Sequence, residues 1–177
     1  MLIVNHAIVL LTILVQGTII FLLASFFLPK KLKNSIFVFF SDHAFLFSFV
    51  VSFFATVTSL YYSEVLGYEP CVLCWYQRIF LFPQVFLFVI GFKRKEKGIV
   101  DVGIVFSTIG AILSLYQYLL QLGIVPTFVC NASSAFCIKR FVFEFGYITI
   151  PLMAFTTFIL LLLLMILVKI RGKKSKT

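Results

Sequence analysis

Charged side chains are scarce in this sequence of 177 residues. Only 12% of the residues are Asp, Glu, Lys or Arg, about half the share of an ordinary soluble domain, and 62% are hydrophobic. The chain also lacks internal repeats, Gly/Ser-rich linkers and the alternating pattern of an outer-membrane barrel. These absences exclude a soluble globular domain and a β-barrel, and they favour a helical membrane protein.

Motifs for the common protein-bound redox cofactors are missing as well. The chain has no glycine-rich dinucleotide-binding fingerprint and no Cys-x-x-Cys-His haem attachment site. Its two histidines lie far in the sequence from its four cysteines. The sequence therefore offers no recognisable site for nicotinamide, flavin or haem.

What the sequence does contain is a series of apolar runs, each long enough to cross a bilayer, for which about 20 residues suffice. Backbone groups in lipid must be hydrogen-bonded within their own segment, so runs of this length are expected to be helical. We predict an all-α integral membrane protein with five transmembrane helices. The five expected helices cover residues 2–29, 36–60, 72–92, 99–122 and 147–169.

Most basic residues lie in alternate loops. Three clusters hold twelve of the fifteen Lys and Arg residues, which is the positive-inside pattern of membrane proteins. It predicts a membrane protein with its N-terminus outside and its C-terminus in the cytoplasm, and it indicates contact with membrane lipid and no nucleic acid. The clusters are Lys30, Lys31 and Lys33; Lys93, Arg94, Lys95 and Lys97; and Lys169, Arg171, Lys173, Lys174 and Lys176.

The first apolar run differs from a secretory signal peptide because it is longer, has no basic residues before it and has lysines after it. We therefore expect this run to be a membrane-anchoring helix rather than a cleaved signal peptide. An outer loop at 123–146 carries two cysteines, and residues 138–145 within it are expected to form a short interfacial helix with an Arg140–Glu144 pair.

Cys71 and Cys74 form a Cys-x-x-Cys motif between two apolar runs. Pro70 and the apolar run that follows indicate a helix start, where free N–H groups and the helix dipole favour a thiolate. Arg78 lies one helical turn beyond Cys74, where it either supports a thiolate and an oxygen-bearing partner or extends to the interface.

Cys130 and Cys137 are separated by six residues in the outer loop. Both cysteine pairs fall on the outer side, where disulfides persist. Two such pairs favour a thiol–disulfide relay, which moves two electrons per exchange. Static disulfides and a four-cysteine zinc site stay open as alternatives, although the second pair lacks the tight spacing of zinc knuckles.

A relay needs a final electron acceptor, and by elimination the obvious one in a bilayer is a quinone, either ubiquinone or menaquinone. Gln117 and Gln121, one turn apart, are candidates to line its head-group pocket or to hydrogen-bond between helices. Asp42 and His43 are further ionisable residues within an apolar run, with an interfacial or mutually paired role as the alternative to a functional one.

The residues around the first cysteine pair resemble the bacterial disulfide bond formation protein B (DsbB) family, especially its BdbC-like branch. The resemblance covers about residues 36–169 and is strongest in a run that continues from Ser59 through the cysteines to Arg78. The runs that carry it are Cys71-Val72-Leu73-Cys74-Trp75-Tyr76-Gln77-Arg78, Tyr116-Gln117-Tyr118-Leu119-Leu120-Gln121 and Gly146-Tyr147-Ile148-Thr149-Ile150-Pro151.

This resemblance implies a four-helix membrane protein-disulfide oxidoreductase that reoxidises an extracytoplasmic thioredoxin-like partner of the DsbA or BdbD type and passes electrons to quinone. It implies that Cys130 engages the partner with Cys137 as its mate, although the compact loop leaves open which of them does so. Cys71 and Cys74 would form the quinone-coupled pair, and Arg78 would contact the quinone. The resemblance implies a bacterial cell membrane protein and divides the chain into an extra N-terminal transmembrane helix with its inner loop at 1–35, a four-helix transmembrane bundle at 36–169 and a basic cytoplasmic tail at 170–177. The helix at 2–29 departs from the family pattern.

Two other interpretations compete with this one. A protein similar to vitamin K epoxide reductase is also a quinone-linked helical bundle, but in that family the Cys-x-x-Cys follows the loop pair, whereas here it precedes it. A non-enzymatic membrane scaffold or metal-binding protein with static cysteines is the other alternative.

Overall fold

The computed structural model describes residues 2–27, 29–94, 97–126, 137 and 141–174, and these residues form an all-helical fold without strands. Five of the helical segments are long and apolar enough to cross a membrane, which confirms the predicted fold class. The α-helices are α1 (Leu2–Ala24), α2 (Lys30–Asp42), α3 (Ala44–Leu60), α4 (Val72–Arg94), α5 (Lys97–Gln121) and α6 (Ile150–Lys174).

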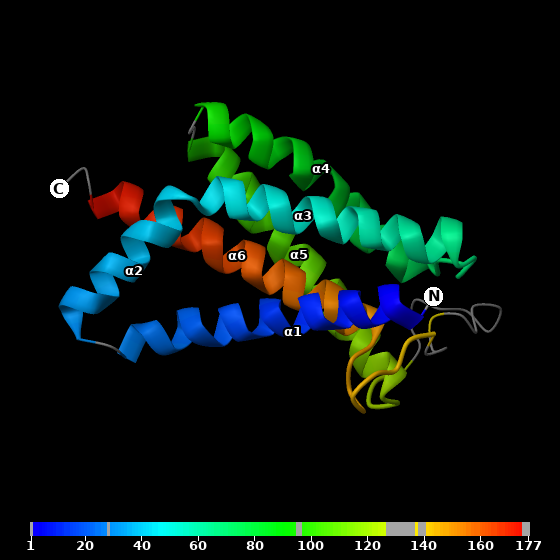
Figure 1. The fold of residues 1–177 in the computed structure, drawn as a ribbon. Helices are drawn as coiled ribbons and strands as arrows, with labels where there is room; N and C mark the ends of the chain where they lie inside the picture. The colour runs from blue at the N-terminus through cyan, green and yellow to red at the C-terminus, as the bar shows by residue number, and fades with distance from the viewer. Residues whose placement is uncertain (1, 28, 95–96, 127–136, 138–140, 175–177) are drawn as a thin grey trace.

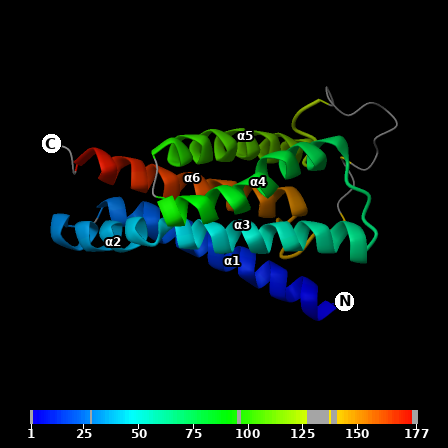
Figure 2. The same cartoon turned by 90° about the horizontal axis from the view of Figure 1, so that it is seen from above.

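Helices α3 to α6 form a four-helix bundle, in which each packs against the next and α6 closes on α3. Helix α1 lies outside this bundle along α6, and α2 packs beside α6 near the C-terminus (Figures 1 and 2). The N-terminus and the segment from α3 to α4 lie at one end, which we call the thiol end because Cys71 is there. The opposite end, with α2 and the C-terminal turns of α6, is the basic end.

Close helix contacts in the bundle depend on glycines that face aromatic rings. A Cβ at Gly110 of α5 would overlap the ring of Phe158 on α6, and a Cβ at Gly91 of α4 would lie 2.5 Å from the ring of Phe45 on α3. Small residues allow membrane helices to approach closely, because lipid provides no hydrophobic force that drives helices together. Phe158 is completely buried as a result.

The thiol end of α3 finishes in a π-helical turn, Tyr61–Val65, in which the N–H of Leu66 donates to the carbonyl of Tyr61. Gly67 follows with a φ of 67°, a left-handed conformation that glycine adopts without steric cost. The chain then turns back toward α4, and Tyr68 stacks on the buried ring of Tyr62 with ring centroids 5.9 Å apart. This turn brings Pro70 and Cys71 to the start of α4.

Three sequence predictions need correction. The expected helix at 36–60 is two helices, because α2 ends at Asp42 and α3 begins again after His43, whose φ of −102° and ψ of 7° break the helix. The last helix begins at Ile150, three residues later than predicted, because residues 144–148 form a tight turn closed by a Glu144–Ile148 bridge.

That turn also replaces the described part of the expected interfacial helix. Residues 141–145 are not helical, and Phe145 has a φ of 52° that no α-helix contains. Arg140, the proposed partner of Glu144, lies outside the described residues. The first apolar run forms α1 to Ala24 and then a short 3-10 turn to Phe27, and α4 and α5 match their predicted ranges within two residues.

Candidate thiol site

The Cys-x-x-Cys pair lies at the N-terminus of α4. Cys71 immediately precedes the helix, and its carbonyl accepts a hydrogen bond from the N–H of Trp75. The sulfurs of Cys71 and Cys74 are free thiols 3.2 Å apart, with Cys71 buried and Cys74 half-buried. The hydrogen bond to Cys74, and then burial, raise the pKa of the Cys71 thiol above its usual range. Cys71 is therefore the member of the pair that keeps its proton.

Gln117 on α5 connects the two sulfurs to the bundle. Its Nε2 lies 3.3 Å from each sulfur, and its Oε1 accepts a 2.6 Å hydrogen bond from Nε2 of Gln77 on α4. Gln117 is only 2% exposed, so its amide has no competing water. The amide is a fixed donor to negative charge on either sulfur.

Cys137 is disulfide-bonded and completely buried. It belongs to the same packed cluster as Cys71, together with Leu73 and Leu120, so the described part of the second pair lies beside the first. Cys130 lies outside the described residues. The structure thus brings Cys137 from the distant loop to the end of the bundle that holds the Cys-x-x-Cys motif.

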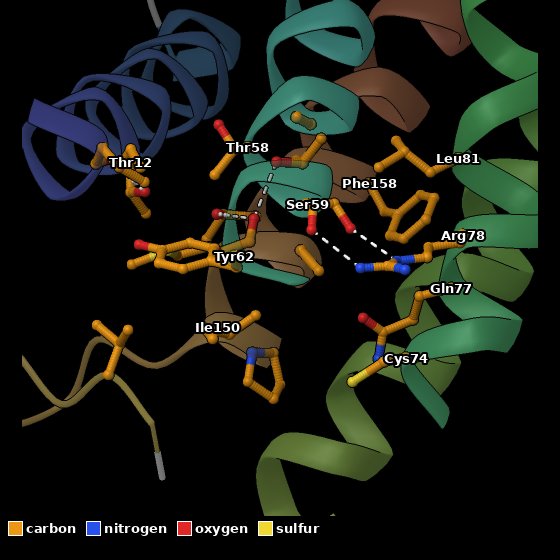
Figure 3. A pocket seen from close by; sticks show the side chains of 18 of the residues that line it. Thr12, Thr58, Ser59, Tyr62, Cys74, Gln77, Arg78, Leu81, Ile150 and Phe158 are labelled. Atoms are coloured by element: carbon orange, nitrogen blue, oxygen red, sulfur yellow. Dashed lines mark hydrogen bonds between the residues drawn. The ribbon is translucent and has the colours of Figure 1, made fainter. Parts of the chain in front are cut away.

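A cavity of about 200 Å³ opens beside Cys74 (Figure 3). Arg78 lines it one turn below and is 92% buried, with its Nε donating to Oγ of Ser59 at 3.0 Å and its Nη2 donating to the Ser59 carbonyl at 2.9 Å. Its guanidinium also lies 5.3 Å from the Trp75 ring centroid. These contacts hold a positive charge in a fixed position inside an apolar cavity.

The remaining walls of the cavity are largely apolar and come from α1, α3 and α6. Gln77, Gln117 and Gln121 add amide groups near the thiols, and Tyr62 lies at the same end. Apolar residues that line it include Ile8, Leu11 and Val15 of α1, Val50, Val51 and Phe54 of α3, and Ile150, Met153 and Phe158 of α6. The cavity therefore combines one polar, reactive corner with long apolar walls.

The candidate residues from the sequence fall into two groups. Cys74, Arg78, Gln117 and Gln121 line one cavity. Asp42 does not join them, because it lies at the basic end and forms an ion pair there with Arg171.

His43 lies at the same helix break as Asp42, where its ring nitrogen Nδ1 is 3.1 Å from the carbonyl of Phe39. The pairing of Asp42 and His43 with each other that the sequence suggested is therefore not present in the structure. Among the residues that the structure describes, no three His, Cys, Asp or Glu side chains gather as metal ligands would.

Two residues of the site were not given roles by sequence reasoning. Gln77 holds Gln117, and Ser59 holds Arg78, so both position groups that contact the cavity. Gln77 carried a usable signal, because a buried amide in a membrane helix requires a partner. Ser59 carried none, since serine is common in membrane helices and often bonds only to its own backbone.

A helical membrane chain with paired thiols at a helix N-terminus, beside an apolar cavity, defines a membrane thiol–disulfide protein. The family model "Disulfide bond formation protein DsbB" matches residues 41–168, and the chain belongs to this family.

Curated relatives agree with this assignment. The SPbeta prophage-derived disulfide bond formation protein B of Bacillus subtilis (strain 168) is 40% identical over 132 residues, which is 75% of this chain and 89% of that protein. Disulfide bond formation protein C of the same strain is 37% identical over 134 residues, 73% of this chain and 93% of that protein. The probable disulfide formation protein C of Halalkalibacterium halodurans is 37% identical over 125 residues, 68% and 89% of the two chains. No solved structure matches the chain.

Proposed function

We propose that this chain is a thiol–disulfide:quinone oxidoreductase that reoxidises an extracytoplasmic thioredoxin-like partner of the DsbA or BdbD type and so supports disulfide bond formation. The observation that carries the proposal is a single cavity lined by the Cys74 thiol, the Arg78 guanidinium and many apolar side chains. Family membership supports disulfide chemistry, and the cavity supports a lipid-soluble acceptor.

The residues present fit a quinone. Arg78 and the Gln77 amide are hydrogen-bond donors for a ring carbonyl oxygen, and the apolar walls suit a ring with an isoprenoid tail. When bound, a quinone supplies an acceptor for two electrons and two protons. Arg78 is the residue best suited to hold its head group, because the Ser59 contacts fix the guanidinium while leaving it in the cavity.

The proposed relay conserves electrons at each exchange. A thiolate of the reduced partner attacks the Cys130–Cys137 disulfide, and its second thiol resolves the mixed disulfide, so the partner leaves oxidised and the loop pair leaves as two thiols. The loop pair then reduces a Cys71–Cys74 disulfide in the same way. Cys71 and Cys74 would then form their disulfide again and give up two electrons and two protons, for which a quinone held by Arg78 would be the acceptor. The packing of Cys137 in one cluster with Cys71 supports direct exchange between the pairs.

Gln117 and the Cys71 thiol have distinct roles in this relay. Because the Gln117 amide donates to both sulfurs, it stabilises whichever sulfur carries negative charge during exchange. Because the pKa of the Cys71 thiol is raised, this thiol keeps its proton until exchange requires it, and Cys74 is the sulfur that lines the cavity.

The relay also requires an orientation, and we propose that the thiol end faces outside with the C-terminus in the cytoplasm. The alternating basic clusters support this orientation. The partner would then reach the loop from the oxidising compartment.

Two cysteine variants test the mechanism with purified protein, a reduced thioredoxin-like partner and added quinone. Cys74→Ser is expected to abolish quinone reduction, followed by the quinone absorbance. Cys137→Ser is expected to abolish partner oxidation but to retain quinone reduction driven by dithiothreitol, which can reduce Cys71–Cys74 directly. Full quinone-coupled turnover by Cys74→Ser would disprove the mechanism.

A further inference from the structure

We propose that α1, which lies outside the family match, forms one wall of the cavity and binds the apolar tail of the quinone. The proposal rests on the proposed function and adds a tail-binding element to it. The family match begins at residue 41, so α1 is an addition to the family unit rather than part of its shared site.

The contribution of α1 comes from a single helical face. The four α1 residues that line the cavity are Ile8, Leu11, Thr12 and Val15. Their spacing of i, i+3, i+4 and i+7 is the spacing of one stripe along an α-helix. A stripe this regular indicates a helix that presents a continuous surface to the cavity along about two turns.

The cavity is polar at one side and apolar at the other. Cys74 and Arg78 project from α4, and Thr12 of α1 lies across the cavity from them (Figure 3). Thr12 itself offers little polarity, because its hydroxyl donates to the carbonyl of Ile8 at 3.0 Å. A ligand with its polar ring at Arg78 therefore extends its apolar part along α1, and a polyprenyl quinone has this shape and polarity.

Helix α1 is held to the bundle by one polar contact before the stripe and one after it along the helix. The hydroxyl of Tyr62 donates to Oδ1 of Asn5 at 3.1 Å, and the hydroxyl of Tyr147 donates to Oε1 of Gln16 at 3.2 Å. In addition, Val9 is only 1% exposed. In lipid an unpaired amide is costly, so these two contacts fix the rotation and the register of α1. A fixed register is what a specific binding wall needs.

Thr12→Phe and Thr18→Phe form a matched pair of variants in the full chain. Both threonines belong to α1 and both donate to the carbonyl four residues earlier, Thr12 to Ile8 at 3.0 Å and Thr18 to Leu14 at 2.9 Å. Only Thr12 lines the cavity. A phenyl ring at position 12 would fill space that the tail requires, whereas a ring at position 18 would leave the cavity as it is.

The probes are a menaquinone with a geranylgeranyl tail and menadione, which has no tail, and each is titrated into purified protein. Separately, the quinone that remains with each purified protein is extracted and identified by mass. Thr12→Phe is expected to bind the tailed quinone about tenfold more weakly and to retain less quinone on purification. Its affinity for menadione, and both affinities of Thr18→Phe, are expected to match those of the wild-type chain.

The outcomes separate this proposal from the proposed function. A wild-type chain that binds neither probe overturns the quinone function itself. If the wild-type chain binds the tailed quinone, two results would overturn the role of α1 as the wall for the tail. One is that Thr12→Phe and Thr18→Phe bind the tailed quinone with equal affinity. The other is that Thr12→Phe loses as much affinity for menadione as for the tailed quinone.

Leu11→Ala tests the same wall if Thr12→Phe fails to fold, because it removes side-chain volume from the wall instead of adding it. Its control is Leu14→Ala, at a site that is 67% exposed and does not line the cavity. Leu11→Ala is expected to weaken retention of the tailed quinone, and Leu14→Ala is expected to retain it as the wild-type chain does. Equal retention by both variants overturns the proposal.

Discussion

Gln117 is a neutral side chain that contacts both thiols at the start of α4. It crosses from α5 to α4, donates to two sulfurs and is itself fixed by Gln77. Because the amide is buried, its dipole is not screened by water and its direction is constant. At the scale of a residue, we therefore propose that the reactivity of Cys71 and Cys74 depends on a group that carries no charge.

Replacing Gln117 by leucine removes this donor while keeping a similar volume. The reduced protein is expected to react about tenfold more slowly with iodoacetamide at Cys74, the more accessible thiol of the pair, because hydrogen bonds to charged groups contribute roughly 1.5–3 kcal/mol. Labelling rates are measured by mass spectrometry of the peptide that contains both cysteines.

Gln84→Leu is the matched control for this experiment. Gln84 is completely buried and accepts a 3.0 Å hydrogen bond from Ser107, but it makes no contact with either sulfur. It is expected to lower thermal stability without slowing alkylation. Equal alkylation rates in Gln117→Leu and Gln84→Leu would contradict the role given to Gln117.

The site was predictable from sequence where helical spacing determined it. A cysteine at 74 and an arginine at 78 must share a face of any helix that contains both, and the structure has them in one cavity. The contact between Gln77 and Gln117 was not predictable, because it depends on the rotation of α4 against α5. No local spacing specifies that rotation.

At the scale of elements, helices with uniform hydrophobicity are the hardest to orient from sequence. Helix α1 is apolar on all sides, so its composition predicted a membrane span but not the face that packs. Its amides Asn5 and Gln16 were the available signals, and both meet tyrosine hydroxyls. The break at His43 was missed because residues 36–60 are apolar enough to read as one continuous run.

For α5 and α6, a close glycine contact identifies the faces that pack against each other. Gly110→Ala is expected to destabilise the protein by about 1–3 kcal/mol, because the added methyl group overlaps the buried ring of Phe158. Gly17→Ala in α1 meets nothing within 4 Å and is expected to be neutral or slightly stabilising, since alanine favours helix. Thermal unfolding in detergent measures both, and a similar midpoint for the two variants would show that the α5–α6 contact tolerates a larger residue.

At the scale of the whole molecule, two exposed ion pairs at the basic end contribute little to the stability of the fold. Lys169 lies 2.8 Å from Asp101 and Arg171 pairs with Asp42, but these side chains are 43–60% exposed. Exposed ion pairs contribute about 0–1 kcal/mol. The position of the charges therefore has its main consequence in membrane orientation, where lysine and arginine are retained on the cytoplasmic side.

Orientation can be tested by labelling single cysteines in a chain whose four native cysteines are replaced by serine. Ile124→Cys at the thiol end and Gly172→Cys at the basic end both fall at exposed positions. Because the basic end is expected in the cytoplasm, a membrane-impermeant maleimide should label position 124 in intact bacteria and position 172 only after permeabilisation. The opposite pattern would place Cys71 and Cys74 on the side of a reducing compartment. The proposed relay could not then accept electrons from an extracytoplasmic partner.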